Sequence, residues 1–413
     1  MDSPKAIVGW VSSPNTRGTV DILFENFLAL FVCVWTVLHH NLQAKHEGFW
    51  TVFLRKCRWA VLAVAAPEML TLFAIMQWNA ANISVKEMRS IGVEPWTIVH
   101  AFYANAGGFV LETPDFPKFP INATSIHYLC SKNRIKLPKI TEESIWDRSK
   151  ADFFAKACAF VQAGWIILQI SARGAQKLTI TPLELFTAAF IIPSLATAYF
   201  WANKPQNVAE PIVIRVGWTM ADLLISAGDA AKEPYVDTPI DFVEKPVWDG
   251  WRRQPGLLHF GGLKKRPLER IPNDYSPPPP TGTEATVNWV IAVAHAVIHV
   301  LGWSFPFATY TETLIWRVSS LTLLIVTVIG GIVPVFSTRP WFDFTFTMLW
   351  IWVRDAKKRT FIRRKLFNSF VDLAYVLYIL ARLLILVEIF TAFRAMPADA
   401  YRCPDWTWFW PHV

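Results

Sequence analysis

Residues 314–336 read LIWRVSSLTLLIVTVIGGIVPVF, and this stretch decides the class of fold. Arg317 is its single charged residue, and a helix that crosses the hydrocarbon of a bilayer needs about 20 mostly apolar residues. Further stretches of the same character lie at 20–38, 58–78, 153–172, 182–201, 286–305 and 370–393. The sequence therefore predicts an all-α fold, a polytopic bundle of transmembrane helices.

The overall composition supports a membrane protein and excludes several other classes. Hydrophobic residues make up 53% and charged residues 17%, against roughly 25% charged residues in an average soluble domain. Five cysteines in 413 residues are too sparse for a disulfide scaffold. The formal net charge of +8 fits loops that lie against anionic lipid. We expect membrane lipids as partners and no nucleic acid, because no nucleic-acid-binding motif is present.

The segment from Trp96 to Leu111 carries no formal charge and decides between eight and seven crossings. Lys and Arg concentrate on the cytosolic side of membrane spans. Few basic residues precede the first span and several follow it: Lys5 and Arg17 before, then Lys45, Arg55, Lys56 and Arg58. If the segment from Trp96 to Leu111, which we call the marginal segment, crosses the membrane, the basic 338–369 loop is also cytosolic. We therefore expect about eight spans, with seven as the alternative, in the endoplasmic reticulum with a lumenal N-terminus.

The chain is expected to form one polytopic membrane domain over residues 1–413. Residues 202–285 would be a cytosolic loop. Within it, Ile212–Ala227 has apolar positions at helical spacing and suits an interfacial helix. The run Pro277–Pro280 predicts a stiff extended spacer before the next crossing.

Ionisable side chains inside a bilayer are costly to bury and are the natural functional candidates. Glu68 follows Pro67 halfway along an apolar stretch, and a buried carboxyl there would suit a general acid. The alternative is a carboxylate paired with a basic residue of another span. His295 and His299 share one helix face. This spacing suits metal ligands, but no third ligand accompanies them, so a proton relay or helix–helix hydrogen bonding is favoured.

His100, Tyr103 and Asn105 form a polar stripe in the marginal segment, and the pair Gly107-Gly108 would let a helix or a ligand approach closely. Catalysis by His100 and simple packing are both open.

Aromatic rings lining a dry cavity stabilise cations, although bulk packing is the default explanation. The rings considered for this role are Trp35, Trp303 and Trp316. Thr181–Glu184 is a capping box with proline at the first helical position, which explains Glu184 structurally. Thr309–Glu312 has the same form, yet Glu312 remains a candidate for substrate binding together with Arg317.

Several strings occur together along most of the chain. They are Gly9-Trp10-Val11, Arg17–Ile22, Cys33–Thr36 with His39 and Asn41, Ala66-Pro67-Glu68, His100-Ala101-Phe102, Gly107-Gly108-Phe109, Ile298-His299 with Trp303 and Phe305, Thr311-Glu312 with Trp316-Arg317, and Ala381-Arg382-Leu383 with Glu388. The combination resembles a large family of multi-span integral membrane proteins of filamentous fungi. The resemblance excludes the spacer around 250–285. It implies a fungal origin and a lumenal N-terminus, but no particular reaction. An analogy to fungal membrane-bound terpene cyclases concerns chemistry only.

These observations favour an integral-membrane enzyme that isomerises or cyclises a lipophilic terpenoid or polyketide intermediate by acid/base chemistry. Glu68 would supply a proton, and His299 or His100 would receive one. The other candidates, His295, Tyr103 and Asn105 among them, would bind the substrate. We expect no cofactor and no metal, since nucleotide-binding and di-iron signatures are missing from the sequence. A membrane acyltransferase using His299 is a minor alternative, and a transporter, a channel or a scaffold remains open.

Overall fold

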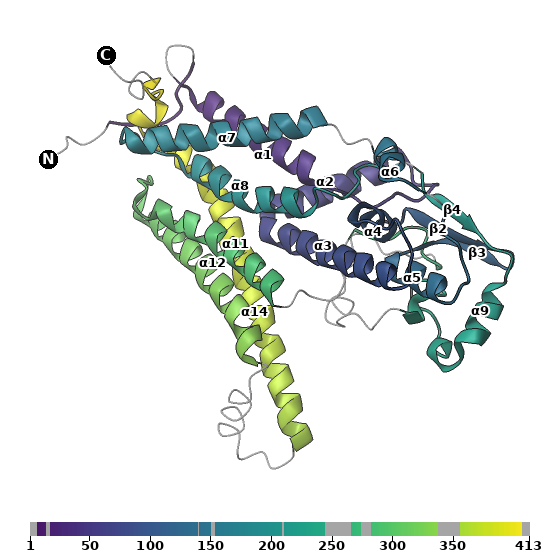
Figure 1. Ribbon diagram of the computed structural model, residues 1–413. Coiled ribbons are helices and arrows are strands. Elements are labelled where there is room, and N and C mark those ends of the chain that lie inside the picture. The colour runs from purple at the N-terminus through teal and green to yellow at the C-terminus, as the bar shows by residue number, and fades with distance from the viewer. Residues whose placement is uncertain are drawn as a thin grey trace. The chain divides into compact units, whose positions relative to one another are not determined.

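The computed structural model describes residues 6–13, 17–138, 140–149, 153–208, 210–243, 266–273, 282–337 and 356–406. Within these ranges the chain is mostly helical (Figure 1). Its contacts divide it into two compact units. Unit 1 comprises residues 1–33, 158–193 and 285–413, and unit 2 comprises residues 34–157 and 194–284. Each unit is described by itself.

The α-helices account for most of the fold. They are α1 (Thr19–Val37), α2 (Phe49–Ala65), α3 (Pro67–Ser90), α4 (Ile98–Asn105), α5 (Ala123–Ser131), α6 (Glu142–Arg148), α7 (Phe153–Ala175), α8 (Pro182–Phe200), α9 (Met220–Ala227), α11 (Thr283–Leu301), α12 (Tyr310–Ser337) and α14 (Ala356–Thr391). Short 3-10 helices are η1 (Gly228–Ala231), η2 (Asp241–Val243), η3 (Gly302–Ser304), η4 (Ala392–Arg394) and η5 (Ala398–Tyr401).

Several of these helices are long and apolar enough to cross a membrane, as expected for a membrane protein. Within the described ranges they number five: Thr19–Val37, Pro182–Phe200, Thr283–Ser304, Tyr310–Gly331 and Asp372–Arg394. A sixth would be α2 and α3 taken together. The expectation of seven or eight spans is therefore not confirmed. The helix α7 forms where a span was expected, but Gln162 and Gln169 interrupt its apolar run, and it is not among the five.

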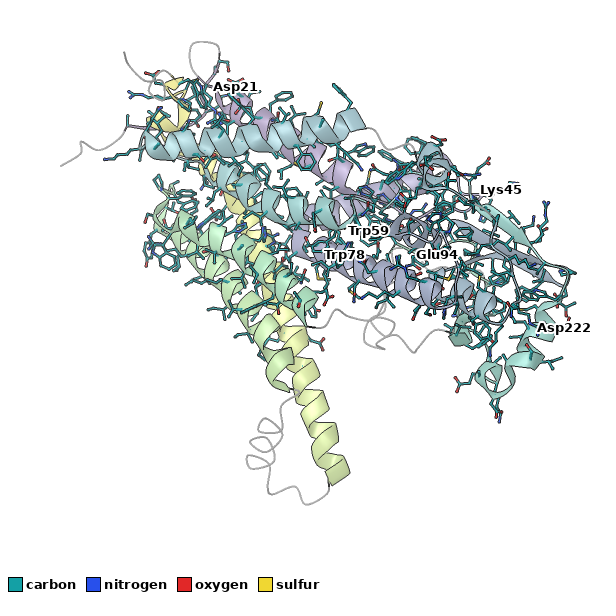
Figure 2. The ribbon with its side chains drawn as sticks, in the orientation of Figure 1. Asp21, Lys45, Trp59, Trp78, Glu94 and Asp222 are labelled. Carbon is teal, nitrogen blue, oxygen red and sulfur yellow. The ribbon has the colours of Figure 1, made fainter. Side chains whose placement is uncertain are left out.

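The stretch 58–78 is not one straight helix, as the sequence suggested. The chain bends by 109° between α2 and α3. Pro67 is the first residue of α3, where a missing backbone N–H does no harm, while its ring prevents α2 from continuing. Across the bend, Trp59 of α2 packs edge-on to Phe73 of α3 with ring centroids 5.8 Å apart (Figure 2).

The marginal segment, Trp96 to Leu111, does not form a helix long enough to cross a membrane, so the preference for eight spans is not confirmed. It contains the eight-residue helix α4 followed by strand β2 (Phe109–Thr113). Gly107, with φ of +88°, ends the helix, and the Gly108 amide donates to the Tyr103 carbonyl at 2.8 Å. The glycines thus close α4 rather than admit a second helix, and the segment is too short and too irregular to span.

Unit 2 holds a three-stranded sheet that the sequence reading missed, so the all-α description is only approximate. Strand β2 lies between β3 (Phe116–Ile121) and β4 (Ile212–Arg215), antiparallel to the first and parallel to the second. Pro117 and Pro120 fall in β3, at an edge, where a missing backbone donor is tolerated. Phe109 and Leu111 point inward and are about 1% and 0% exposed.

The single interfacial helix expected at Ile212–Ala227 is not formed, and two shorter elements take its place. Its first part is the strand β4, and its second part is the short helix α9, whose N-cap Thr219 accepts a hydrogen bond from the Asp222 amide (Figure 2). Arg215, which breaks the apolar pattern, ends the strand. The spacer Pro277–Pro280 lies outside the described residues, as does 338–355 of the basic loop.

Unit 1 contains a helical pair and a small terminal sheet. Helices α12 and α14 lie side by side (Figure 1). Strand β1 (Ile7–Val8) pairs antiparallel with β5 (Met396–Pro397). The Tyr401 hydroxyl donates to the Gly9 carbonyl at 2.9 Å and adds to this pairing.

Candidate functional site

His299 is a fully buried imidazole in the last turn of α11, and its tautomer follows from one contact. Its Nδ1 lies 3.0 Å from the backbone oxygen of His295. A carbonyl can only accept, so Nδ1 carries the proton and Nε2 carries a lone pair. Nε2 is enclosed and finds no hydrogen-bond partner within the described parts of the chain. His299 therefore presents a buried, unprotonated nitrogen.

His295, one turn earlier on α11, has a structural partner. Its Nδ1 donates to the Ala189 carbonyl of α8 at 2.9 Å. Pro193 lies inside α8, and because proline has no backbone N–H it cannot bond the carbonyl four residues before it, which is that of Ala189. His295 thus donates to a backbone oxygen that has no helical donor because of the proline. Such a replacement hydrogen bond is valuable in a candidate membrane span, where no water is at hand.

The Phe186 ring lies between His299 and a buried cation. The Phe186 ring of α8 meets the imidazole edge-on at 5.9 Å. The Arg382 guanidinium of α14 lies over the other rings of the group, 5.9 Å from the centroid of Phe186 and 5.9 Å from that of Tyr378. Arg382 is 3% exposed, and its charge acts on both imidazoles. We call His299, Phe186, Tyr378 and Arg382 the His299 cluster.

Trp316 contacts the backbone of His299 rather than its imidazole ring. Its indole N–H donates to the His299 carbonyl at 3.2 Å, and the side chain is fully buried. The last carbonyls of a helix have no partner within the helix, so the indole caps α11. Packing therefore explains Trp316, which the sequence singled out for cation binding.

The His299 cluster combines the elements of proton transfer from carbon. An enclosed imidazole lone pair can accept a proton, and a buried guanidinium can stabilise an oxyanion that forms as the proton leaves. An imidazolium beside Arg382 would be repelled, but an enolate formed in the same step carries the compensating negative charge. A fixed guanidinium disfavours a carbocation, which argues for carbonyl chemistry over carbocation chemistry at this position.

The polar stripe in unit 2 holds the local structure together. His100 Nδ1 accepts from the Thr97 amide at 3.3 Å, and Nε2 lies 2.9 Å from the Ile140 carbonyl, so both ring nitrogens are engaged. The Tyr103 hydroxyl donates to the Glu210 carbonyl, and Asn105 Oδ1 accepts from the Ala123 amide. These four contacts fix the connections between elements of unit 2.

Glu68 and Trp35 also lie in unit 2. Glu68 is in the first turn of α3, where a carboxylate interacts favourably with the positive end of the helix. Trp35 is 45% exposed, and the Lys56 ammonium lies 5.7 Å from its ring centroid. Neither belongs to the His299 cluster, which consists of unit 1 residues.

The remaining candidates in unit 1, Trp303, Arg317 and Glu312, all have partners in the structure. The Arg317 guanidinium lies 5.0 Å from the ring centroid of Trp303 and donates to its carbonyl at 2.9 Å. Glu312 forms an ion pair with Arg394, and its amide donates to the Thr309 hydroxyl, which confirms the capping contact expected there.

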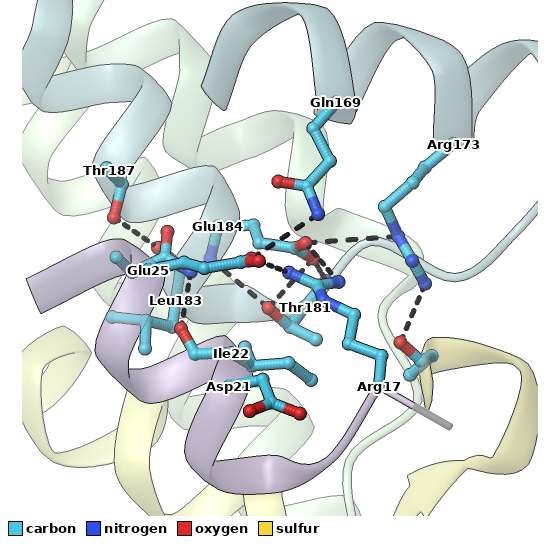
Figure 3. A network of polar contacts seen from close by, with 12 residues as sticks. Arg17, Asp21, Ile22, Glu25, Gln169, Arg173, Thr181, Leu183, Glu184 and Thr187 are labelled. Atoms are coloured by element: carbon cyan, nitrogen blue, oxygen red, sulfur yellow. Dashed lines mark hydrogen bonds and ion pairs between the residues drawn. The ribbon is translucent and has the colours of Figure 1, made fainter. Parts of the chain in front are cut away.

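A buried charge network in unit 1 contains residues that the sequence did not single out (Figure 3). Glu184 caps its own helix through Thr181, as predicted, and also pairs with Arg17 at 2.7 Å. Arg173 is fully buried and donates to the carbonyls of residues 179, 399, 400 and 402. Long-range partners of this kind leave no local pattern. The network fixes chain ends and helices, and nothing in it points to chemistry.

No group of three or more His, Cys, Asp or Glu side chains that could hold a metal ion is found among the residues the structure describes. His295 and His299 share a face, with ring centroids 4.9 Å apart, but each Nδ1 is committed to a carbonyl.

Comparison with known proteins adds a family but no activity. A family model described as a family of unknown function, DUF8562, matches residues 2–227 and 284–413. The match leaves out 228–283, which contains most of the expected spacer. No curated protein and no solved structure matches the chain. Because the match extends over most of its length, the chain belongs to the DUF8562 family of unknown function.

Proposed function

We propose that this protein is an integral-membrane isomerase that shifts a proton within a lipophilic carbonyl compound, with His299 as the base. The enclosed Nε2 of His299 is the observation on which the proposal rests. In the reaction, Nε2 takes a proton from the carbon next to the carbonyl, and the electron pair of the C–H bond moves into an enolate oxygen near Arg382. His299 then returns the same proton to another carbon of the conjugated system. Product and substrate have equal mass, and no co-reactant is consumed.

The positive charge of Arg382 narrows the class of substrate. A polyketide-like carbonyl compound gives an enolate, which the guanidinium of Arg382 stabilises. A terpenoid that reacts through a carbocation would meet a like charge there. Cyclisation remains the alternative expected from the sequence. It would use two groups, with Glu68 as the proton donor and His299 or His100 as the proton acceptor.

The proposed location is the endoplasmic reticulum of a fungal cell, with the N-terminus in the lumen. The support is the distribution of Lys and Arg around the first apolar helix and the resemblance to fungal membrane proteins.

The test compares membranes from cells that produce the wild-type chain or the His299→Phe variant. Lipid extracts are analysed by liquid chromatography and mass spectrometry for compounds that change retention time without changing mass. We expect such pairs with the wild type and their loss with His299→Phe. His46→Phe is the matched control, because His46 is exposed and pairs with Glu269 at the surface. Equal product patterns for wild type and His299→Phe, in chains that both elute as folded protein, would remove the proposal.

One observation favours transport as a second candidate. The 109° break between α2 and α3 interrupts a would-be span, and interrupted helices with polar groups at the break line ion pathways in transporters. Purified chain in vesicles loaded with a pH-sensitive dye would then conduct protons, and Glu68→Gln would abolish the flux. A dye signal equal to that of empty vesicles rejects this candidate.

A further inference from the structure

Lys204 is the most deeply buried ammonium group in the described part of unit 2. It follows α8 and is 2% exposed. Its Nζ donates to Gln77 Oε1 at 2.9 Å and lies 4.7 Å from the ring centroid of Trp201. Gln77 Oε1 is shared, since the Trp201 indole donates to it at 3.1 Å. An ammonium has three donors, and these contacts use one hydrogen bond and one ring face.

The chain just after Lys204 is fastened to the segment that carries His39 and His40. Gln206 Nε2 donates to the Leu38 carbonyl at 3.1 Å, and Lys56 Nζ donates to Asn207 Oδ1 at 3.0 Å. These bonds bring Lys56 of α2 and the residues after α1 beside the residues after α8. We call His40, Lys56 and Lys204 the basic cluster.

A further lysine borders this cluster. His39 Nδ1 donates to the Val37 carbonyl at 2.7 Å, so its Nε2 accepts from Lys156 Nζ at 3.3 Å. No carboxylate pairs with Lys56, Lys156 or Lys204 among the described residues, whereas Arg55 nearby is paired with Glu47. Positive charge therefore gathers here without a counter-ion from the described protein.

Burial and like charges both act against protonation in the basic cluster. Burial lowers the pKa of Lys204 to about 7. Burial and the charges of Lys56 and Lys204 lower the pKa of His40 to about 3. His40 Nε2 is enclosed and has no hydrogen-bond partner within the described ranges. Uncompensated buried cations destabilise a fold, and a bound anion would relieve this repulsion and satisfy the open donors.

We propose that the basic cluster binds a phosphate group through Lys204, Lys56 and His40. Lysines hold phosphate as point charges and need no planar geometry. Two candidate spans, Thr19–Val37 and Pro182–Phe200, end shortly before His40 and Lys204, and the ends of membrane spans lie at the level of the polar headgroups. His40 and Lys56 are only partly buried, so the cluster is not sealed. Basic pockets at such positions recognise phosphorylated headgroups. The site lies outside the His299 cluster and does not depend on the proposed reaction.

The phosphate group can come from a lipid or from solution, and two experimental arms separate these sources. In the first, the full chain is placed in nanodiscs of phosphatidylcholine with or without phosphatidic acid, and lipid retained on the protein is counted by native mass spectrometry. In the second, inorganic phosphate is added to detergent-purified chain, with chloride at equal ionic strength as reference, and the thermal midpoint is followed.

We expect the wild-type chain to retain phosphatidic acid, or its thermal midpoint to rise with phosphate but not with chloride. The apparent affinity for the probe should be at least about tenfold weaker in Lys204→Met and in Lys56→Met. A response to phosphatidic acid alone assigns a lipid, and a response to both probes assigns the phosphate group itself. Lys45→Met is the matched control, because Lys45 is an exposed lysine of the same unit (Figure 2). An equal loss in Lys45→Met and Lys204→Met would mean general surface attraction and would overturn the site. No response in either arm from folded wild-type chain would do the same.

Discussion

His295 of α11 donates to the Ala189 carbonyl of α8, and this carbonyl lacks its helical donor because Pro193 follows it by one turn. The two helices are thus joined where one of them is interrupted. In a low-dielectric surrounding, an unsatisfied carbonyl is costly, so the pair has a measurable consequence.

Replacing His295 by Phe should lower the stability of the chain by about 1–3 kcal/mol, because the Ala189 oxygen loses its donor. In a Pro193→Ala background the residue 193 amide can bond Ala189 itself, so His295→Phe should then have a smaller effect. Thermal midpoints of the wild type, both single variants and the double variant form the cycle. Additive effects would show that His295 does not act through this carbonyl.

The buried pair of Arg17 and Glu184 should be more sensitive than any exposed pair. Arg17→Met leaves a buried carboxylate without its closest cation, and the expected loss is about 3–5 kcal/mol. Glu112→Gln, in the exposed pair with Arg215, is the comparison and should leave the midpoint unchanged. The interpretation fails if both substitutions shift the midpoint equally.

Gly108 should not accept a side chain. A Cβ placed there would lie 2.4 Å from ring atoms of Tyr103, so Gly108→Ala should cost about 1–3 kcal/mol through overpacking. Tyr103→Leu should recover part of that loss. Gly164→Ala on α7 meets no atom within 4 Å and should stabilise its helix by about 0.5–1 kcal/mol. Equal losses from both alanines would contradict the assignment.

The stability difference between Lys204→Met and the wild type should depend on pH in one direction. The pKa of Lys204 is about 7 in the fold against an ordinary 10.5, so between these values the unfolded chain binds the extra proton. Stability of the wild type therefore rises with pH across this window. His39 and His40, with pKa values of about 3, stay neutral throughout.

Without phosphate or anionic lipid, Lys204→Met should stabilise the chain most below pH 7, by a few kcal/mol in order of magnitude. The gain should shrink towards pH 10. Thermal midpoints in neutral detergent at pH 6 and pH 9 provide the measurement. A gain that is the same at both values would mean that Lys204 does not titrate as described.

The sequence predicted those features that depend on local patterns. Apolar runs marked the helices that are long enough to cross a membrane, and Thr181–Glu184 marked the start of α8. The same method was wrong for 96–111, because an uncharged apolar run can be a short helix followed by a buried strand. The turn at Pro114-Asp115 and the edge prolines of β3 were the signals for that hairpin.

The candidate sites were less accessible from sequence. His299 stood out because histidine is rare in apolar helices, yet Phe186 reaches it from another helix and carries no pattern of its own. Lys204 was overlooked because a lysine after an apolar run is usually an exposed end. Its burial depends on Gln77 and Trp201, and the neighbouring chain is held by Lys56. Partners so distant in the chain become visible only in three dimensions.

The pairing of β1 with β5 joins Ile7 to Pro397, and this has a consequence for biosynthesis. Strand β1 leaves the ribosome long before its partner exists, so this segment must wait until the residues up to Pro397 have been translated. A nascent chain stopped short of Met396 therefore cannot complete unit 1. Quality-control machinery would meet such a product with its N-terminal strand edge still unprotected.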